Sequence, residues 1–553
     1  MPDYNVGDLV SDFLSENNVD TAFGVVSVHN IPMLDAIARR NRINFVPARG
    51  EMGAGHMADG FSRSKNGLGV VFTSTGPGAA NIAGALVEAR FAGTSLLHIT
   101  GQTATENLDK KQGTVHEVPN QLDMLKSVSK KAFRIKNPEE ALSILEEATR
   151  CSLTPPTGPV SVEIPIDVQR SLIKKPDNIQ NVKIDQKDLF LGDKNSIDHI
   201  EKNIRDSERK VLWIGNGAKT LKSEVKKFID LGFAVVTSTQ AKGVIDEDNK
   251  MCLGAFNAVP KVENFYSTID LMIVVGSRLR GHETRDMSLK LPKNLVQIDI
   301  DPDAKDRTYK SSFFHLGDAK YVLNELLTRI SDLKKAKKEW IAEVETLKND
   351  ILDEYKSFLG VYKDFPQIVR ECLPKGGRWI RDVTISNSTW GNRMMPLFDA
   401  SENIYPVGAG IGPGMALAIG ASMAKTDVKS IAMCGDGGFM LNLPDLWTAV
   451  EVNSNVVFMV MNDKGYGVIK HIQDSLYGGR KNFADLTVPN FLELAKTVKM
   501  NYLLVGSSSE FKEKLEKAFN LTGPVLLEID VLSVGEMPRY FVPPPFTKKD
   551  KSS

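Results

Sequence analysis

The chain has 553 residues, with 69 lysines and arginines against 69 aspartates and glutamates, and four cysteines that lie far apart in the sequence. This length exceeds what one hydrophobic core supports, and the balanced charge excludes a basic groove for nucleic acid or an anionic membrane surface, so we expect several domains and a small-molecule ligand. Because CxxC pairs, long apolar runs and a signal-peptide pattern are all missing, we predict a cytoplasmic protein without membrane insertion.

The first part of the chain alternates short apolar runs with longer segments of helical period. Residues 69–72 and 95–99 are such runs, each typical of a buried strand. This alternation predicts βα units around parallel sheets and therefore the α/β class. A polar stretch at 174–178 predicts a linker, so we assign residues 1–170 to the first domain.

Two further α/β units are predicted after this linker. The second opens with an apolar run at 210–214 that leads into a glycine turn, and further strands are predicted at 271–275 and 295–300. We assign it residues 187–335. A charged segment at 331–358 predicts a helix with a solvated face, and the third unit is assigned residues 360–545.

The first and third units end in similar segments. Residues 157–164 (TGPVSVEI) and 522–529 (TGPVLLEI) agree at six of eight positions. A repeated pattern indicates a repeated supersecondary unit, so the two domains are expected to share one fold. The alternative is that both segments are ordinary turn-to-strand junctions.

Acidic residues follow two predicted strands of the third unit. The strand at 430–434 ends in Gly435-Asp436-Gly437-Gly438, before a predicted helix at 443–452, and the strand at 456–461 ends in Asn462-Asp463. Glycines at a strand end let backbone N–H groups approach a phosphate, and carboxylate oxygens suit Mg²⁺. Gly-Asp-Gly alone is more often a plain turn. Two acidic strand ends separated by one helix are a much more specific indication of a metal and phosphate site.

This arrangement resembles the thiamine-diphosphate (ThDP) enzymes related to acetolactate synthase, pyruvate oxidase and benzoylformate decarboxylase, whose motif is GDG, about 25 residues, then NN or ND. The resemblance covers almost the whole chain and implies two related ThDP-binding domains flanking a Rossmann-like middle domain. It places Mg²⁺ on Asp436, Asp463 and the Gly465 carbonyl, with Asn462 as the neighbouring alternative. It also places three residues beside the cofactor: Gly437, Gly438 and Tyr466, the last of which either closes over the pyrimidine or only packs.

The first domain resembles the half of the family's site that activates the cofactor. Residues 45–60 match the region whose glutamate hydrogen-bonds the aminopyrimidine, and Glu51 falls on that position. Read alone, Glu51 starts a helix, where a carboxylate could simply favour the helix dipole. Residues 73–81 look like the family's TSGPGxxN turn, which implies that Asn81 lies next to the pyrimidine.

Residues 407–415 resemble the loop that holds ThDP in a bent shape. By that resemblance Ile411 is the apolar wedge between the rings, and the Ala409 carbonyl accepts from the 4′-amino group. The alternative for Ile411 is a core side chain in a glycine-rich loop. Upstream, Ser388 lies in a hydroxyl-rich stretch, 386–389, that suits diphosphate oxygens.

Two histidines are candidates for handling protons on the substrate. His116 stands where acetolactate synthases usually carry the glutamine of Phe-Gln-Glu, and Val115 replaces the phenylalanine. His29 lies in another loop that lines the pocket in relatives, and His282 of the middle domain is a weaker candidate. Ile472 replaces a tryptophan that shapes the second-substrate pocket, which puts strict acetolactate synthase activity in doubt.

The resemblance predicts a ThDP- and Mg²⁺-dependent decarboxylase or carboligase that acts on 2-oxo acids. One alternative is a lyase or decarboxylase of 2-hydroxyacyl-CoA or oxalyl-CoA, and another is a non-catalytic nucleotide-binding or regulatory protein. Arg278, Asp299 and Asp301 offer groups for the FAD or ADP that relatives hold in the middle domain, but Asp301 equally starts a plain turn, so no flavin is predicted. Because the family builds each site from two chains, a homodimer or homotetramer is expected.

Overall fold

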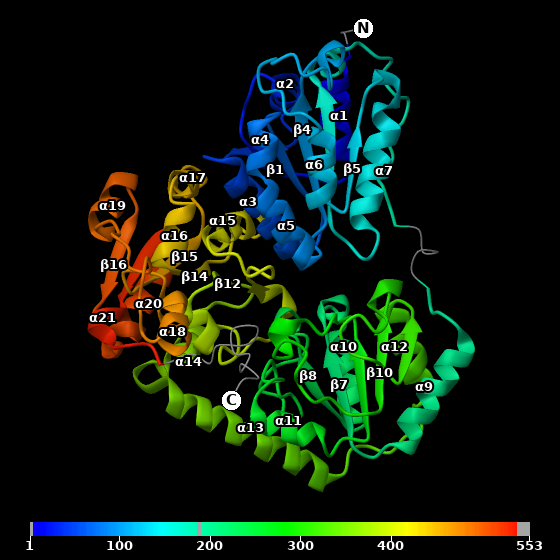
Figure 1. Ribbon diagram of the computed structural model, residues 1–553, viewed down its shortest axis with the longest axis vertical. Helices are drawn as coiled ribbons and strands as arrows, with labels where there is room; N and C mark the ends of the chain where they lie inside the picture. Colours follow the sequence, from blue (N-terminus) through cyan, green and yellow to red (C-terminus); the bar gives the residue numbers. More distant parts are fainter. Residues whose placement is uncertain (1–3, 185–189, 539–553) are drawn as a thin grey trace.

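The computed structural model describes residues 4–184 and 190–538. Three parallel β-sheets, each packed with helices, follow one another along the chain (Figure 1), which confirms the predicted α/β class. The predicted start of the middle domain, residue 187, and the predicted end of the third domain, residue 545, lie outside the described residues. Within the described residues, no helix is both long and apolar enough to cross a membrane, and all four cysteines are free thiols.

Six parallel strands form the sheet of the first domain, in the order β2-β1-β3-β4-β6-β5. Strands β3, β4 and β6 are buried along their whole length, as expected for a parallel sheet covered on both faces. The strands are β1 Thr21–Gly24, β2 Asn44–Pro47, β3 Gly69–Thr73, β4 Leu96–Gln102, β5 Lys131–Arg134 and β6 Pro159–Pro165. The helices are α1 Val6–Glu16, α2 Ile31–Arg40, α3 Glu51–Lys65, α4 Pro77–Asn81, α5 Ala83–Ala92, α6 Gln121–Val128, α7 Ala141–Leu153 and α8 Ile166–Arg170.

The middle domain has a five-stranded parallel sheet in the order β11-β10-β9-β7-β8. Numbered within the domain, this is the doubly wound order 2-1-3-4-5. The strand order reverses between β7 and β9, which is the topological switch point of the sheet. The strands are β7 Lys210–Ile214, β8 Phe233–Thr237, β9 Leu271–Val275, β10 Leu295–Asp299 and β11 Phe313–Leu316. The helices are α9 Lys194–Asp206, α10 Lys222–Asp230, α11 Pro260–Tyr266 and α12 Ala319–Arg329.

The third domain repeats the topology of the first. Its sheet has the order β13-β12-β14-β15-β17-β16, so both sheets read 2-1-3-4-6-5 when strands are numbered within each domain. The two similar segments form β6 and β17, the sixth strand of each sheet, which confirms that they belong to one repeated fold. The strands are β12 Trp379–Arg381, β13 Asn403–Ile404, β14 Ser430–Gly435, β15 Val456–Asn462, β16 Asn501–Val505 and β17 Val525–Asp530. The helices are α14 Phe365–Cys372, α15 Pro413–Ala424, α16 Asp436–Leu441, α17 Asp445–Glu451, α18 Gly467–Leu476, α19 Phe491–Val498, α20 Phe511–Asn520 and α21 Val531–Val534.

The charged segment after the middle domain is a helix, α13, which spans Lys338–Leu359. Most of its charged residues are exposed, as predicted, but one face is buried against the middle domain. Trp340 stacks on Phe265 and donates from its indole nitrogen to the Gly232 carbonyl at 2.9 Å. The helix therefore anchors the connection between the second and third domains.

The first and third domains pack through α3 and α15, which face each other in Figure 1. Glycines make this contact close: a Cβ on Gly60 would lie 2.1 Å from the Leu417 carbonyl oxygen, and one on Gly420 would lie 1.8 Å from that of Met57. Only glycine fits at either position, because any side chain would overlap the facing backbone.

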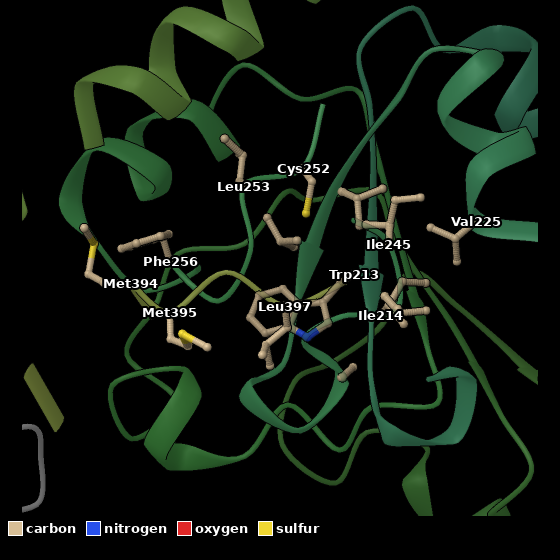
Figure 2. Close-up of a cluster of buried hydrophobic side chains, with 14 of the residues drawn as sticks. Trp213, Ile214, Val225, Ile245, Cys252, Leu253, Phe256, Met394, Met395 and Leu397 are labelled. Atoms are coloured by element: carbon tan, nitrogen blue, oxygen red, sulfur yellow. The ribbon is translucent and has the colours of Figure 1, made fainter. Parts of the chain in front are cut away.

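A segment of the third domain completes the core of the middle domain (Figure 2). Met394, Met395 and Leu397 pack among buried side chains that include Trp213 and Phe256. Beside this cluster, the buried Lys242 ammonium donates to the Glu247 carboxylate at 2.7 Å, and the same carboxylate accepts from the Leu397 N–H at 2.9 Å. All three domains are thus packed against one another.

Candidate active site

Two carboxylates meet at the carboxyl edge of the third sheet. Strands β14 and β15 pair in parallel up to Gly435, so Asp436 and Asp463, which follow them, lie side by side. Asp436 accepts from the N–H of Gly437 at 2.8 Å and from that of Gly465 at 3.0 Å. The structure thereby brings together Asp436, Asp463 and the backbone of Gly465, the residues from which the three metal ligands are expected.

This pair has the chemistry of a cation site. Burial raises the pKa of Asp436, and burial together with the neighbouring Asp436 carboxylate raises the pKa of Asp463. A divalent cation would remove this repulsion, and two carboxylates with a backbone carbonyl are the hard oxygen donors that Mg²⁺ prefers. Since no group of three His, Cys, Asp or Glu side chains with metal-binding geometry occurs among the described residues, a third protein ligand has to come from elsewhere, as the Gly465 carbonyl would.

The helix predicted at 443–452 is present as α17, with bounds within two residues of those expected. Helix α16 already begins at Asp436, and a second helix, α17, begins at Asp445. Pro444 has no N–H to donate, which favours a break between α16 and α17. Because α16 begins at Asp436, the N–H groups of Gly437 and Gly438 belong to its first turn, which leaves them without carbonyl partners inside the helix.

Tyr466 packs onto the glycine segment. A Cβ on Gly437 would come within 2.6 Å of the Tyr466 ring, so the ring lies directly on the backbone there. The backbone N–H of Tyr466 donates to the Ala484 carbonyl at 2.8 Å, which fixes the turn that follows β15. Of the two expectations for Tyr466, the structure shows the packing contact.

The predicted cofactor loop is held at both ends by buried carboxylates. Glu88 of the first domain accepts from the N–H groups of Val407 at 2.5 Å and Gly408 at 2.8 Å. Asp382, just after β12, accepts from those of Gly412 at 2.9 Å and Gly414 at 3.2 Å.

Between these ends, the Ala409 N–H donates one backbone hydrogen bond, to the Pro406 carbonyl at 3.4 Å. Ala409 has the left-handed value φ = 63°, and a Cβ on Gly410 would meet nothing within 4 Å. Ile411 is 41% exposed, so it is not a core side chain, and that alternative from the sequence is excluded.

Asp382 gives a prediction for the pH dependence of stability. Burial raises its pKa to about 6, although three backbone N–H groups oppose the shift. A carboxyl with a raised pKa stabilises the fold only while protonated, so this contribution is present below the unfolded pKa and is lost as pH rises towards about 6. Between about pH 4 and pH 7, we expect the free energy of unfolding of wild type to fall by about 3 kcal/mol relative to that of Asp382→Asn. Denaturant titrations of both proteins across this range test it, and a constant difference would contradict it.

Glu51 and Asn81 meet in the first domain as expected. Glu51 is the first residue of α3, and its Oε2 accepts from the Asn81 side-chain amide at 3.1 Å. Both line a cavity of about 310 Å³ with Leu441, Asn442 and Asp445 of the third domain. Among the described residues that line this cavity, neither Asp436 nor Asp463 occurs, so the carboxylate pair and Glu51 of one chain face different spaces.

The two candidate histidines lie next to each other. Their ring centroids are 5.2 Å apart, and His116 Nδ1 is 3.5 Å from the Ser74 hydroxyl. Burial, and next the proximity of His116, lower the pKa of His29. His282, by contrast, is an exposed residue of a short turn in the middle domain.

A buried polar network that sequence analysis missed supports the turn between β3 and α4. The Gln121 side-chain oxygen accepts from the Gly76 N–H at 2.6 Å and from the Thr75 hydroxyl at 2.9 Å, while its amide donates to Glu163 at 3.0 Å. The His116 carbonyl packs on the same turn, since a Cβ on Gly76 would lie 2.0 Å from that oxygen. Gln121 therefore fixes the turn against which His116 rests.

Ser388 lies in a single π-helical turn, Asn387–Gly391, and is half-buried. Its carbonyl accepts from Arg393 at 3.1 Å. The neighbouring Ser386 is fully buried, and its hydroxyl has no hydrogen-bond partner in the described structure. Within the hydroxyl-rich stretch, Ser386 is thus a buried group with an unused donor.

A cavity of about 600 Å³ opens at the carboxyl end of the middle sheet, where doubly wound sheets bind ligands. Arg278, Asp299 and Asp301 all line it, together with residues of the first domain such as Arg63 and Phe91. Asp301 also caps the turn that follows, because it accepts from the Asp303 N–H at 3.0 Å. The predicted groups therefore face one space, and Asp301 has the structural role as well.

Together these features define a class: a three-domain α/β protein in which two copies of one fold carry the halves of a cofactor site. Family models agree along the chain. Residues 4–124 match the thiamine pyrophosphate enzyme N-terminal TPP binding domain, residues 197–326 the central domain and residues 386–529 the C-terminal TPP binding domain. The chain belongs to this family of ThDP-dependent enzymes.

Curated relatives match almost the full length of the chain. A probable acetolactate synthase large subunit of Methanocaldococcus jannaschii is 28% identical, over 96% of this chain and 92% of its own. The mitochondrial acetolactate synthase catalytic subunit of Saccharomyces cerevisiae is 26% identical, over 95% of this chain and 80% of its own. The acetolactate synthase large subunit of Haemophilus influenzae is 26% identical, over 95% and 94%.

Proposed function

We propose that the protein is an acetolactate synthase-like decarboxylase or carboligase that uses ThDP and Mg²⁺ to act on 2-oxo acids. The observation that carries this proposal is the Asp436–Asp463 carboxylate pair, buried at Asp436 and half-buried at Asp463, at two adjacent strand ends of a TPP-binding domain. The names of the relatives support the substrate class.

The third domain would hold the diphosphate and the metal. Asp436, Asp463 and the Gly465 carbonyl would bind Mg²⁺, and the amides of Gly437 and Gly438 would face diphosphate oxygens. Hydroxyls of the stretch around Ser388 would add donors. Ala409 would accept from the cofactor's amino group through its carbonyl, Ile411 would support the bent shape and Tyr466 would line the site.

The first domain would control protons. ThDP, when bound, would supply a carbanion for addition to a carbonyl carbon and an acceptor for the electrons left by departing CO₂. Glu51 would share a proton with the pyrimidine N1′ nitrogen, and the Asn81 amide would hold the carboxylate in place, as its 3.1 Å bond does here. His116 and His29 would transfer protons to and from the substrate.

We further propose a homodimer or homotetramer in the cytoplasm. Support for self-association comes from the cavity of Glu51, whose described lining residues do not include the carboxylate pair of the same chain. A second chain that presents its own third domain to Glu51 would complete the site. Sedimentation at working concentration tests this, and a stable monomer with full activity would contradict it.

The histidine pair gives a prediction on turnover. His116→Gln is expected to lower kcat by about 10- to 100-fold with little change in the KM for ThDP, because it removes a proton-transfer group without touching the cofactor. His29→Asn should act in the same direction, and the double variant should fall short of the summed effects because the rings are in contact. Steady-state kinetics measure this. His199→Asn, whose ring packs on Phe313 in the middle domain, is the matched control.

Assaying CO₂ release from pyruvate and benzoylformate, with ThDP and Mg²⁺ present, tests the proposed function. Activity on neither, but on oxalyl-CoA or a 2-hydroxyacyl-CoA, would favour the alternative chemistry, to which the 600 Å³ cavity of the middle domain lends support. Mass spectrometry of ligands extracted from purified protein would identify FAD, ADP or CoA if that cavity holds one. If calorimetry detected no binding of ThDP, the alternative of a non-catalytic nucleotide-binding or regulatory protein would be favoured.

A further inference from the structure

The backbone that leads into the cofactor loop is held by side chains from the other two domains. Arg63 of α3 donates to the Tyr405 carbonyl at 2.7 Å, and Arg280 of the middle domain donates to the Val407 carbonyl at 2.7 Å. Glu88 of α5 accepts from two consecutive N–H groups, those of Val407 and Gly408.

Glu88 and Arg63 belong to a buried charged cluster. Arg63 bonds both oxygens of Asp59, at 2.5 and 2.7 Å, and one oxygen of Glu88 at 3.0 Å. Asp59 is fully buried, Glu88 is 4% exposed and the Arg63 side chain 7%. The Thr94 hydroxyl donates to Asp59 at 2.6 Å and completes the set.

Such a buried charged cluster contributes little to the stability of the fold by itself. Removing several charges from water costs as much as their attraction returns, and apolar residues of similar size stabilise a core at least as well. What apolar residues do not provide is a pair of oxygens aimed at two adjacent backbone N–H groups. The geometry of Glu88 does provide it, and its target is the backbone immediately before Ala409 and Ile411.

We propose that Glu88, held by Arg63, is a positioning residue for the cofactor loop, and this rests on the proposed function. Glu88 fixes the start of the loop and Asp382 fixes its end, which leaves residues 409–411 to project between two anchored points. The Ala409 carbonyl and the Ile411 side chain are thereby presented to the cofactor before it binds. Preorganisation of this kind improves affinity by lowering the ordering cost of binding.

Helix α3 then contributes to two sites in a dimer. Its first residue, Glu51, would serve the cofactor held by the partner's third domain. Near its end, Asp59 and Arg63 support the loop of their own chain, whose site is completed by the partner subunit. Each active site therefore depends on α3 of both chains.

The primary test compares Glu88→Gln with Glu224→Gln, a buried carboxylate in α10 that bonds only groups of the middle domain. Glu88→Gln is expected to raise the KM for ThDP by about 10- to 100-fold, since it loses a charged hydrogen bond to the loop. Hydrogen exchange should accelerate at Val407 and Gly408 but not at Gly412 and Gly414, which Asp382 holds. Glu224→Gln should change neither quantity.

Several outcomes overturn the proposal. An unchanged KM for ThDP and unchanged exchange at Val407 and Gly408 would do so. If Glu88→Gln does not fold, Glu88→Asp is the second variant, because it keeps the charge but has a shorter side chain. A wild-type KM for ThDP together with wild-type exchange at Val407 and Gly408 in Glu88→Asp would also overturn the proposal. If wild type itself does not bind ThDP, the proposed function fails, whereas faster local exchange in the variant would still establish the positioning role.

Mixed dimers test which loop Glu88 supports. Co-expressed Glu51→Gln and Glu88→Gln chains should yield about a quarter of the wild-type activity at limiting ThDP, because half of the dimers in a random mixture are mixed and each of these has one intact site. That result is expected only if Glu88 acts on the loop of its own chain. No recovery above the two parent proteins would overturn this assignment.

Discussion

A Glu51→Gln protein is expected to lose at least about 100-fold in kcat while its KM for ThDP changes by less than about tenfold. Glutamine keeps the size of the side chain and can still accept from Asn81, whose amide lies 3.1 Å from Glu51 Oε2. It lacks the proton that a carboxyl shares with the pyrimidine, so chemistry suffers more than binding. Single-turnover kinetics with saturating ThDP measure the effect directly.

Glu451→Gln is the matched control for this change. Glu451 ends α17 and pairs with Arg49, close to the same cavity, yet it does not line that cavity. Its replacement should leave kcat within about twofold, as for most surface substitutions. If Glu51→Gln and Glu451→Gln behaved alike, the assignment of Glu51 as the cofactor-activating residue would be wrong.

An Asp436→Asn protein is expected to bind Mg²⁺ and ThDP at least about 100-fold more weakly, because a neutral amide oxygen replaces a charged ligand of a hard cation. Without cofactor the variant should be as stable as wild type or more so, since a like charge beside Asp463 is removed. With cofactor at about 100 times the wild-type Kd, the free energy of unfolding of wild type should rise by about 2.7 kcal/mol, and that of the variant should rise far less.

Thermal unfolding with and without ThDP and Mg²⁺ separates these effects. Asp485→Asn serves as the control, since Asp485 is exposed and pairs with Lys470 next to the same turn. It should keep the stabilisation by cofactor. If Asp436→Asn retained the full stabilisation, Asp436 would not be a metal ligand.

The fold was predictable wherever a local pattern determines the structure. Apolar runs such as 210–214 and 456–461 became strands because a parallel strand buried on both faces needs uninterrupted apolar residues. The similar segments at 157–164 and 522–529 predicted the shared topology. Helix α16 was missed because Gly437 and Gly438 suggest a break after the strand at 430–434, since glycine is a poor helix former.

The site was predictable only for residues that lie in short motifs. Glu51 with Asn81, and Asp436 with Asp463, come together as their motifs imply. The supporting groups were not predictable, because Glu88 and the N–H of Val407 are 319 residues apart and nothing local to either marks the contact. The same holds for Gln121, whose partners at the turn before α4 are about 45 residues away.

The glycine contact between α3 and α15 has a consequence for recombination of this chain with its relatives. At Gly60 and Gly420 the two backbones approach so closely that neither helix can shift to accommodate a side chain on the other. A chimera with a breakpoint in the middle domain inherits α3 from one parent and α15 from another, and it folds only if both parents have glycine at these positions. Unless both parents have these glycines, the first and third domains can therefore be exchanged only together, from one parent. The middle domain can be replaced separately only if its substitute keeps the contacts to Met394, Met395 and Leu397.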